Sequence, residues 1–444
     1  AVRLAVVVQR YGPAINGGAE LHARYIAERL ARHATVEVLS TCARDYVTWR
    51  NELPPGTEQV NGVLVHRFPV VHERDTIVFA RQSEQVFERP HSLDDEMAWL
   101  DTEGPTSPAL VEYASQHASD FDFFIVFSYR YWVAYHVIRA VGPKAILVPT
   151  AERDPAIGLT IFRSIFRGVG ALMYNSPEER AMIQAVSRNG ELPSVVVGVG
   201  SDIPSGVRPD HFRRKFQIDG PFAVYVGRLD QNKGCQQLFD WFDAYLRAGA
   251  GRLSLVLVGH SLLTVPQHPR IRHLGYQSDE DKFNAIAAAD LLIMPSYFES
   301  LSMVALEAWA LGRPVLANGA CDVLKGQCIR SNAGLYYETV DEFVEALVTV
   351  ERTPWLAAML GRNGRRFYRE HYDWPVVERK YLDMLSSLPA RTAQPIAADA
   401  SWLERRRPIC PAASAVLAGI PSGWSGDRIP VGAVARGESR QAGR

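Results

Sequence analysis

Short apolar runs alternate with helical stretches along most of the chain, and this alternation constrains the fold more than any other feature. Leu4–Val8 (LAVVV) and Phe123–Phe127 (FFIVF) are apolar on successive residues, as strands buried on both faces of a parallel sheet are. Leu4–Val8 is followed by a Gly-containing turn and a helical pattern through Leu21, Tyr25 and Leu30. Since strands that alternate with helices form stacked βαβ units, the pattern predicts an α/β fold with a doubly wound sheet.

The same pattern starts again after a turn-rich segment, Gly198–Gly206 (GVGSDIPSG). Further strands are expected at Phe222–Val226, Leu253–Val258, Ile271–Leu274, Leu291–Met294 and Pro314–Ala317. A chain of 444 residues also exceeds the length at which one hydrophobic core stops growing. We therefore predict two Rossmann-like domains, 1–200 and 201–372.

Two stretches lie outside this pattern. The segment 70–108 is polar with scattered aromatic residues and prolines, which indicates an insertion or a helical excursion from the first domain. The segment 391–444 is rich in Ala, Arg, Pro, Gly and Ser without a period, which is typical of a disordered tail. We assign no function to the segment 391–444.

Composition excludes several classes of protein. The chain has 48 Lys plus Arg and 49 Asp plus Glu, a formal net charge of -1, and so lacks the overall cationic field that nucleic-acid binding favours. Its five cysteines form no CxxC pair, which suits reduced thiols better than disulfides or a metal site. No apolar run approaches the ~20 residues of a membrane span, and the first residues resemble a strand more than a signal peptide. We expect a cytoplasmic protein.

One segment, IFRSIFRGVGALMY, leaves contact with a membrane surface open. Its apolar residues recur at helical spacing beside two arginines: Phe162, Ile165, Phe166 and Val169, with Arg163 and Arg167. A basic amphipathic helix of this kind lies on a bilayer, which would make the protein a peripheral membrane protein. The alternative is a helix that faces the core and keeps its arginines in water.

Candidate site residues follow the predicted strands, since ligands of doubly wound sheets bind at the carboxyl ends of the strands. The first such loop, YGPAINGGAE, places Gly17 and Gly18 directly before a helix. Glycines there let backbone amides approach an anion or a sugar closely, although they also suit a plain tight turn. The loop lacks the GxGxxG pattern of dinucleotide-binding dehydrogenases.

The second loop, GRLDQNKG, follows the strand Phe222–Val226 and holds two cations. Arg228 can bind phosphate oxygens with two parallel hydrogen bonds, and Lys233 adds a second positive charge five residues later. The two side chains together would neutralise a diphosphate. Simple solvation of both cations is the alternative.

The third segment, PSYFESLSMVALEA, contains two acids that bracket a predicted helix start. Glu299 lies in the loop, and Glu307 lies within a mostly apolar helix, where a carboxylate needs hydrogen-bond donors such as ribose hydroxyls. The amides near Leu301, Ser302 and Met303 are unpaired at the helix start and favour a phosphate. Both glutamates could instead be solvated.

Together these three segments resemble the retaining glycosyltransferases of the GT-B fold, specifically glycosyltransferase family 4. The resemblance covers about residues 1–390, through the Gly-Gly turn, the Arg/Lys loop and the Glu-x7-Glu motif from Glu299 to Glu307. It implies two Rossmann-like domains that face a cleft, with acceptor binding in the first and nucleotide-sugar binding in the second. It also implies that a helix in 373–390 crosses back to the first domain.

The resemblance assigns roles to single residues. Arg228 and Lys233 would bind the donor diphosphate and neutralise the departing nucleotide, so that they count with Glu299 as catalytic. Glu299 would contact the donor sugar, and Glu307 would hold the ribose hydroxyls. Gly18, beside Gly17, would lie against the diphosphate or the sugar. The donor-binding set is completed by the helix start at Leu301, Ser302 and Met303.

The first domain departs from the family pattern. Many members carry a histidine of the sugar pocket after a first-domain strand, where this chain has Phe127 and Ser128. In the next strand-end loop, PTAERD, the resemblance places Glu152 at a position that is histidine in some relatives. Glu152 could bind hydroxyls of the donor or acceptor, or pair with Arg153, and both interpretations stay open.

These residues predict a hexosyltransferase that moves a hexose from a nucleoside diphosphate sugar to a hydroxyl acceptor with retention of configuration. The family's mechanism uses no protein nucleophile, and no His or Asp cluster of this sequence has metal-ligand spacing, so we expect neither a metal nor another cofactor. A sugar-nucleotide epimerase and a non-catalytic sugar-nucleotide-binding protein are the alternatives.

Overall fold

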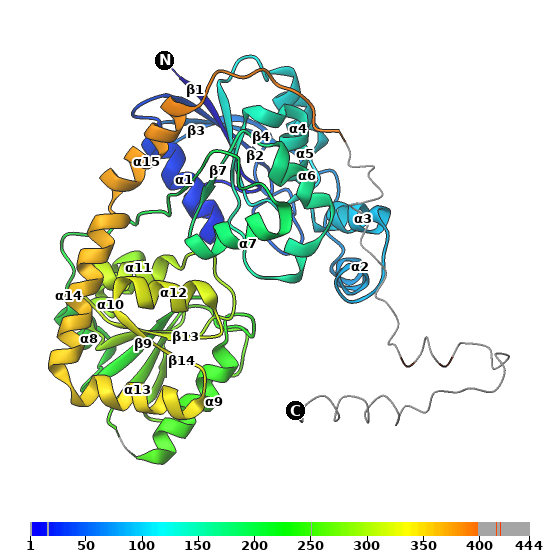
Figure 1. The fold of residues 1–444 in the computed structure, drawn as a ribbon. Helices are drawn as coiled ribbons and strands as arrows, with labels where there is room; N and C mark the ends of the chain where they lie inside the picture. The colour runs from blue at the N-terminus through cyan, green and yellow to red at the C-terminus, as the bar shows by residue number, and fades with distance from the viewer. Residues whose placement is uncertain (1, 16, 250, 398–413, 415–417, 419–444) are drawn as a thin grey trace, which may run out of the picture. The chain divides into compact units, whose positions relative to one another are not determined.

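The computed structural model describes residues 2–15, 17–249 and 251–397, together with residues 414 and 418. The described chain up to residue 397 belongs to one compact unit that contains two sheets, each covered by helices (Figure 1). The predicted α/β fold with two Rossmann-like domains is confirmed.

The first sheet has, within the described chain, eight strands in the order β3-β4-β2-β1-β5-β6-β7-β8. They are β1 (Arg3–Val7), β2 (Thr35–Thr41), β3 (Gly56–Val60), β4 (Val63–Phe68), β5 (Phe123–Phe127), β6 (Ala145–Val148), β7 (Ala171–Tyr174) and β8 (Ser194–Val196). Neighbouring strands run parallel except β3 and β4, which form an antiparallel hairpin at one edge. The parallel strands therefore end at a common edge, at which the candidate residues of the first domain lie.

The helices of this half connect its strands and cover both faces of the sheet (Figure 1). They are α1 (Gly18–Leu30), α2 (Thr76–Glu88), α3 (Leu93–Glu103), α4 (Pro108–Gln116), α5 (Trp132–Val141), α6 (Ile161–Gly168) and α7 (Pro177–Ser187), with short 3-10 turns at Gly142–Lys144 and Pro155–Gly158. The segment 70–108 is a helical excursion, since α2 and α3 pack on each other and bury Trp99.

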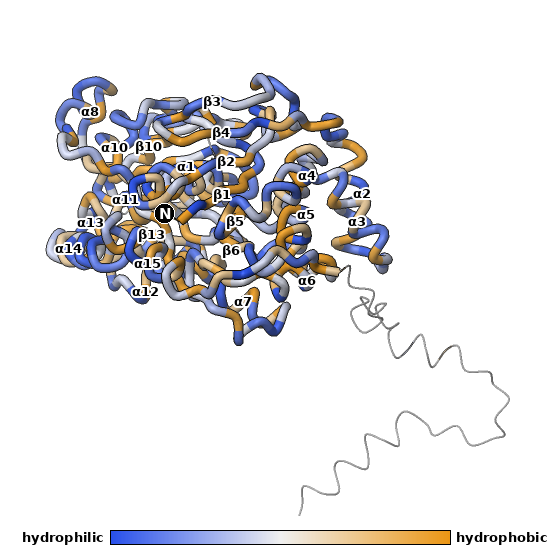
Figure 2. Tube along the Cα trace, turned by 90° about the horizontal axis from the view of Figure 1, so that it is seen from above, coloured by the Kyte–Doolittle hydropathy of each residue, from blue (hydrophilic) through white to orange (hydrophobic). Residues whose placement is uncertain are grey.

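The helix expected in IFRSIFRGVGALMY is α6, and it faces the core. Phe162, Ile165 and Phe166 are fully buried against α5 and α7, whereas Arg163 is partly buried and Arg167 is exposed. Figure 2 shows α5 and α6 as largely hydrophobic segments at the first sheet. The interpretation of α6 as a bilayer-binding helix is wrong, because protein already covers its apolar side.

The second sheet has six strands in the described chain, all parallel, in the order β11-β10-β9-β12-β13-β14. They are β9 (Phe222–Val226), β10 (Ser254–Val258), β11 (Ile271–His273), β12 (Leu291–Met294), β13 (Val315–Asn318) and β14 (Gly334–Tyr337). The helices are α8 (Pro209–Phe216), α9 (Cys235–Ala248), α10 (Asp279–Ala288), α11 (Met303–Ala310), α12 (Asp322–Ser331), α13 (Val340–Arg352), α14 (Pro354–His371) and α15 (Trp374–Ser387). Every residue of β9 and β12 is buried, as their unbroken apolar sequences predict.

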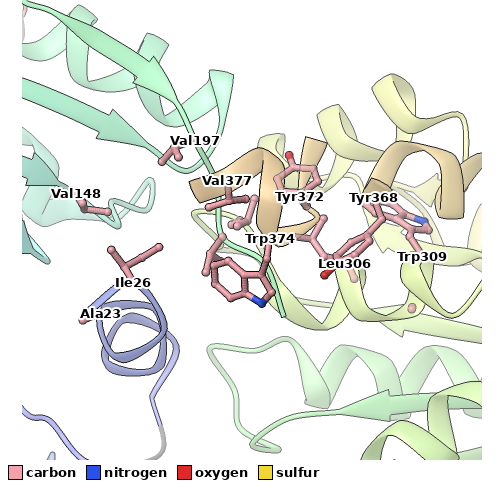
Figure 3. Close-up of a cluster of buried hydrophobic side chains, with 14 of the residues drawn as sticks. Ala23, Ile26, Val148, Val197, Leu306, Trp309, Tyr368, Tyr372, Trp374 and Val377 are labelled. Carbon is pink, nitrogen blue, oxygen red and sulfur yellow. The ribbon is translucent and has the colours of Figure 1, made fainter. Parts of the chain in front are cut away.

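Helix α15 packs against elements of the first sheet. Its Trp374 meets Tyr25 of α1 edge to face at 5.5 Å, and the guanidinium of Arg29 lies 4.0 Å from the centre of the Trp374 ring. Figure 3 shows Trp374 and Val377 within the buried cluster that also contains Ile26 of α1. The helix implied for 373–390 thus contacts the first half of the molecule.

The chain continues beyond α15 as an extended segment over the first half. The N–H of Ile396 donates to the carbonyl of Arg139 at 2.8 Å, and the Arg139 guanidinium donates back to the carbonyl of Ile396. Residues 391–397 of the segment predicted as a disordered tail are therefore held against α5. The remainder of 391–444, apart from residues 414 and 418, lies outside the described residues.

Candidate functional site

The loop after β9 brings Arg228 and Lys233 to the carboxyl end of the second sheet. Asp230 organises this loop, since its carboxylate accepts the N–H of Lys233 at 2.8 Å and pairs with the guanidinium of Arg228. The Arg228 side chain is 50% exposed and can still reach a ligand. Gly234 closes the loop at φ 72°, and a Cβ there would lie 2.1 Å from the carbonyl oxygen of Pro295. Glycine therefore allows the loops after β9 and β12 to touch.

Lys233 and Glu299 join these two loops through an ion pair, with Nζ 2.9 Å from Oε1. Burial by itself would lower the pKa of Lys233, but the carboxylates of Glu299 and Glu152 raise this pKa well above its ordinary value. The ammonium group is thus fully charged at neutral pH. A fixed cation beside a carboxylate suits a ligand with both a phosphate and hydroxyl groups.

Glu152 reaches the same place from the first sheet, in the loop after β6. Burial, and after it the charges of Glu299 and Asp154, raise its pKa to about 7, although Lys233 and Arg130 act in the opposite direction. Its carboxyl accepts no hydrogen bond from the described residues. A partly buried carboxyl of this kind, close to other charged groups at strand ends, is typical of a functional site.

The buried Glu179 of α7 holds the Glu152 loop in place. Its carboxylate accepts the N–H of Ala151 at 2.6 Å and the N–H of Asn175 at 2.5 Å. Burial raises the pKa of Glu179 to about 8, against the effect of these hydrogen bonds. We interpret Glu179 as a positioning residue, because both of its carboxylate oxygens bind backbone N–H groups.

Ser128 lies at the end of β5, and Thr150 lies at the end of the adjacent β6. Their hydroxyl oxygens are 2.9 Å apart, and both residues have a left-handed backbone, with φ of 66° and 48°. A positive φ costs free energy for residues with a Cβ and is concentrated at functional sites. Ser128 is buried below the surface of the site, so its hydroxyl orients the Thr150–Glu152 loop.

Glu307 is almost fully buried, at 2% exposure, on α11. Its Oε1 accepts hydrogen bonds from the Ser201 hydroxyl at 2.7 Å and from Lys282 Nζ at 3.1 Å. Its Oε2 has no partner among the described residues. The Tyr368 hydroxyl accepts the backbone N–H of Ser201 and donates to the Ser201 carbonyl, each at 3.2 Å. One carboxylate oxygen of Glu307 is therefore a buried acceptor that lacks a donor among the described residues.

The start of α11 separates the two glutamates. Ser302 adopts φ 72° and caps the helix by accepting the N–H of Ala305, while Leu301 before it is buried. Met303 is the first helical residue. The backbone at the end of β12 therefore turns sharply, which directs the positive end of the α11 dipole toward the strand-end edge of the sheet.

The Gly-Gly turn precedes α1, as predicted. A Cβ on Gly17 would lie 2.2 Å from a carboxylate oxygen of Glu20, which is engaged in a buried ion pair with Arg10. By contrast, a Cβ on Gly18 would meet no atom within 4 Å. Gly17 is therefore needed for packing, and the open space at Gly18 is where a ligand can approach the backbone.

A small pocket, open to solvent, lies beside Glu299. Both halves of the molecule line it: Ala151, Arg153, Glu178, Glu179, Met182, Tyr297, Phe298, Glu299, Ala320, Cys321, Asp322 and Val323. Arg153 does not pair with Glu152, since it forms an ion pair with Asp322 at 2.6 Å. Arg228, Lys233 and Glu307 are not part of this pocket.

Sequence reasoning missed three residues of the site. Lys282 and Ser201 bind Glu307, and Asp230 binds the guanidinium of Arg228 and the backbone N–H of Lys233. Asp230 lies between Arg228 and Lys233 in the sequence and could have been found as an internal counter-charge. Ser201 and Lys282 carry no local signal, because their contacts to Glu307 span 106 and 25 residues of the chain.

Residues 220–352 match the family model of glycosyl transferases group 1. A sucrose-phosphate synthase of Thermosynechococcus elongatus is structurally similar, with a TM-score of 0.62 and 18% identity over 87% of this chain and 100% of that one. HepE of Anabaena, solved with UDP and glucose, has a TM-score of 0.63 and 20% identity, again over 87% and 100%. The fold is that of the GT-B glycosyltransferases.

Sequence relatives agree with the GT-B fold. A mannosylfructose-phosphate synthase of Agrobacterium fabrum is 26% identical over 43% of this chain, and the match spans 45% of that relative. An uncharacterized glycosyltransferase of Methanocaldococcus jannaschii is 22% identical over 86% of this chain and 97% of its own length. These similarities support glycosyl transfer as the general activity of the GT-B chain. In the part of the chain that the structure describes, no helix is long and apolar enough to cross a membrane.

Proposed function

We propose that this protein is a retaining hexosyltransferase of glycosyltransferase family 4, which moves a hexose from a nucleoside diphosphate sugar to a hydroxyl acceptor. The observation that carries the proposal is the Lys233–Glu299 ion pair of 2.9 Å beside Arg228, at the carboxyl ends of β9 and β12. It places two cations and a carboxylate where a doubly wound sheet binds its ligand. Neighbouring structures hold such donors, since HepE was solved with UDP-glucose.

In this proposal Arg228 and Lys233 bind the diphosphate. Arg228 is half exposed and can turn from Asp230 to phosphate oxygens, while Lys233 is held close to its place by two carboxylates. As the bond to the sugar breaks, negative charge grows on the departing phosphate, and preorganised cations stabilise that charge more in the transition state than in the ground state.

Glu307 recognises the ribose in this proposal. Its unpartnered Oε2 would accept a ribose hydroxyl, while Ser201 and Lys282 keep its Oε1 in position. A buried acceptor without a donor costs free energy, and a ribose hydroxyl would remove that cost.

Glu299 and Glu152 would contact the hexose from two sides. Glu299 would accept a sugar hydroxyl with its second oxygen, since Oε1 is engaged by Lys233. Glu152 has no hydrogen-bond partner in the described chain and would bind a hydroxyl of the donor or acceptor from the first domain. Because its pKa is about 7, both protonation states of Glu152 are populated at neutral pH.

In this proposal the anomeric configuration is retained because the acceptor oxygen attacks the anomeric carbon on the face from which the diphosphate departs. The bond from the anomeric carbon to the diphosphate oxygen breaks, and a bond to the acceptor oxygen forms on the same face. The acceptor proton moves to the departing phosphate oxygen. Neither a protein nucleophile nor a metal is required in this scheme.

The test is to incubate the purified chain with UDP-, GDP- and ADP-hexoses, with and without a panel of sugar, sugar-phosphate and lipid-linked acceptors. We expect tight binding of one nucleotide, slow hydrolysis of its sugar and transfer with the anomeric configuration of the donor, measured by calorimetry and by NMR of the product. A product of inverted configuration would exclude the retaining mechanism. An epimerised nucleotide sugar formed without acceptor, or binding without any turnover, would replace the proposal by one of its alternatives.

A further inference from the structure

Helix α14 has one face firmly packed against the protein. A Cβ on Gly364 would lie 2.4 Å from the Trp309 indole of α11, and a Cβ on Gly361 would lie 2.1 Å from the carbonyl of Gly312. Phe367 is buried on the same side and meets Trp309 edge to face at 5.6 Å. These close contacts fix the rotation of α14 about its axis, and therefore also fix which residues point outward.

The outward face combines one large aromatic residue with arginines. Trp355, in the first turn of the helix, is 69% exposed. Arg362, Arg366 and Arg369 follow 7, 11 and 14 residues later, so that at about 100° per residue all four lie within roughly 40° of one line along the helix. This line is opposite to Gly364. Figure 2 shows α14 as a largely hydrophilic segment.

The positive charges of this face are not neutralised by ion pairs. Within the described chain Arg362, Arg366 and Arg369 form no ion pair, and their side chains are exposed. Arg365, on the flank, donates to the carbonyl of Leu311 and pairs with no acid in the described chain. The exposed Glu370 is the acid of α14 beside this face. The stripe therefore keeps an excess of positive charge.

Further cations gather on the flank of the stripe. Burial and the nearby charges of Arg365 and Arg213 lower the pKa of Arg313, against the effect of Asp290. Arginines of α8, of the α11–β13 connection and of α14 thus lie close enough together to repel one another.

We propose that the α14 face, defined as Trp355, Arg362, Arg365, Arg366 and Arg369, binds the surface of an anionic lipid bilayer. The face spans about 21 Å and would bind mainly through the charge of its arginines, with Trp355 as the one apolar anchor, because the apolar side of α14 is packed against the protein. A tryptophan prefers the headgroup region, where its ring is apolar and its N–H is wet.

A bilayer fits this face better than a nucleic acid does. The arginines form a straight, flat stripe with an aromatic residue at one end and not interleaved between them, as base stacking would require. The whole chain has a formal net charge of -1, so it does not attract polyanions as a whole. Only the α14 face would attract an anionic surface. This inference does not depend on the proposed transfer reaction, and it assigns membrane contact to α14 in place of the buried α6.

The experiment measures co-sedimentation of the full chain with vesicles of phosphatidylcholine alone and of phosphatidylcholine mixed with phosphatidylglycerol, at low and high salt. We expect binding to the mixed vesicles at low salt and its loss at high salt. The triple variant Arg362→Glu/Arg366→Glu/Arg369→Glu should bind about a hundredfold more weakly. Trp355→Ala should weaken binding and remove the vesicle-dependent protection of tryptophan fluorescence from acrylamide.

The matched control changes three exposed arginines, one just after α1, one on α2 and one just after α7, by the same charge: Arg32→Glu/Arg81→Glu/Arg188→Glu. It should keep most of the binding, and circular dichroism should show that all variants are folded. The proposal is overturned if wild type ignores anionic vesicles at low salt, if the control loses as much binding as the α14 variant, or if duplex RNA but not vesicles binds with the same arginine dependence.

Discussion

Nζ of Lys233 lies 2.9 Å from Oε1 of Glu299, and this ion pair joins the loops after β9 and β12. The pair links the residue that we assign to the diphosphate with the residue that we assign to the sugar. It also depends on Gly234, where a Cβ would collide with the carbonyl of Pro295. Charge and backbone packing therefore act together at this point of the site.

Lys233→Ala should reduce nucleotide affinity and lower kcat/KM by about a hundredfold, because one preorganised cation is lost from the leaving group. Isothermal calorimetry with the nucleotide and initial rates with its sugar measure the two effects. Lys325→Ala, which removes a partly exposed lysine paired with Glu338, is the control and should behave as wild type. Equal loss in both variants would contradict the assignment.

Glu307→Gln should weaken discrimination between ribose and deoxyribose. Wild type should bind the 2′- and 3′-deoxy forms of its nucleotide more weakly than the ribose form, and the variant should narrow this difference. Ser201→Ala is the matched control, since it removes one hydrogen bond from Glu307 at a cost of about 1 kcal/mol but keeps the carboxylate. If both variants retain full discrimination, Glu307 does not contact the ribose.

Glu152→Gln should stabilise the protein above neutral pH. The folded-state pKa of Glu152 is about 7 and its ordinary value is 4.5, so between these values the folded chain holds a proton that the unfolded chain has released. Stability therefore falls as pH rises through this window, by on the order of 2 kcal/mol once Glu152 is ionised. Urea unfolding at pH 4 and pH 8 should show the gain of the variant only at pH 8.

The exposed Glu191 provides the control for this measurement, and Glu191→Gln should give the same small difference at both pH values. For activity, we expect the variant to flatten the change of kcat/KM near pH 7 if Glu152 contacts the substrates. An unchanged pH profile together with the stability gain would leave Glu152 as a purely structural carboxyl.

Gly142→Ala should destabilise the protein by several kcal/mol. Gly142 has φ 52°, and a Cβ there would lie 2.0 Å from the carbonyl oxygen of Gln394. Truncation after residue 390 should remove the collision, so that the substitution costs less in the shortened chain than in the full one. Thermal unfolding of the four proteins tests this coupling. Equal costs in both backgrounds would show that 391–397 does not hold its place in solution.

Much of the fold was predictable because the apolar residues of a buried strand follow one another in the sequence. β9 and β12 are apolar at each residue, and a strand covered on both faces needs that composition. β3 was missed because it is a hairpin strand at the sheet edge, where Thr57, Glu58 and Gln59 are all exposed. Its polar sequence resembles a loop, and its pairing with β4 supplies the structure.

The sequence by itself determined the two doubly wound sheets and the placement of Arg228, Lys233 and Glu299 at strand ends. Apolar periodicity and the alternation of strands and helices along the chain suffice for that. The tertiary structure decided which of these groups meet. It brought Ser201 to Glu307 and Glu152 toward Lys233, across long stretches of chain that carry no local signal. It also decided between core and bilayer for α6. An apolar helix face is stable in either surrounding, so only the packing of its neighbours could settle the choice.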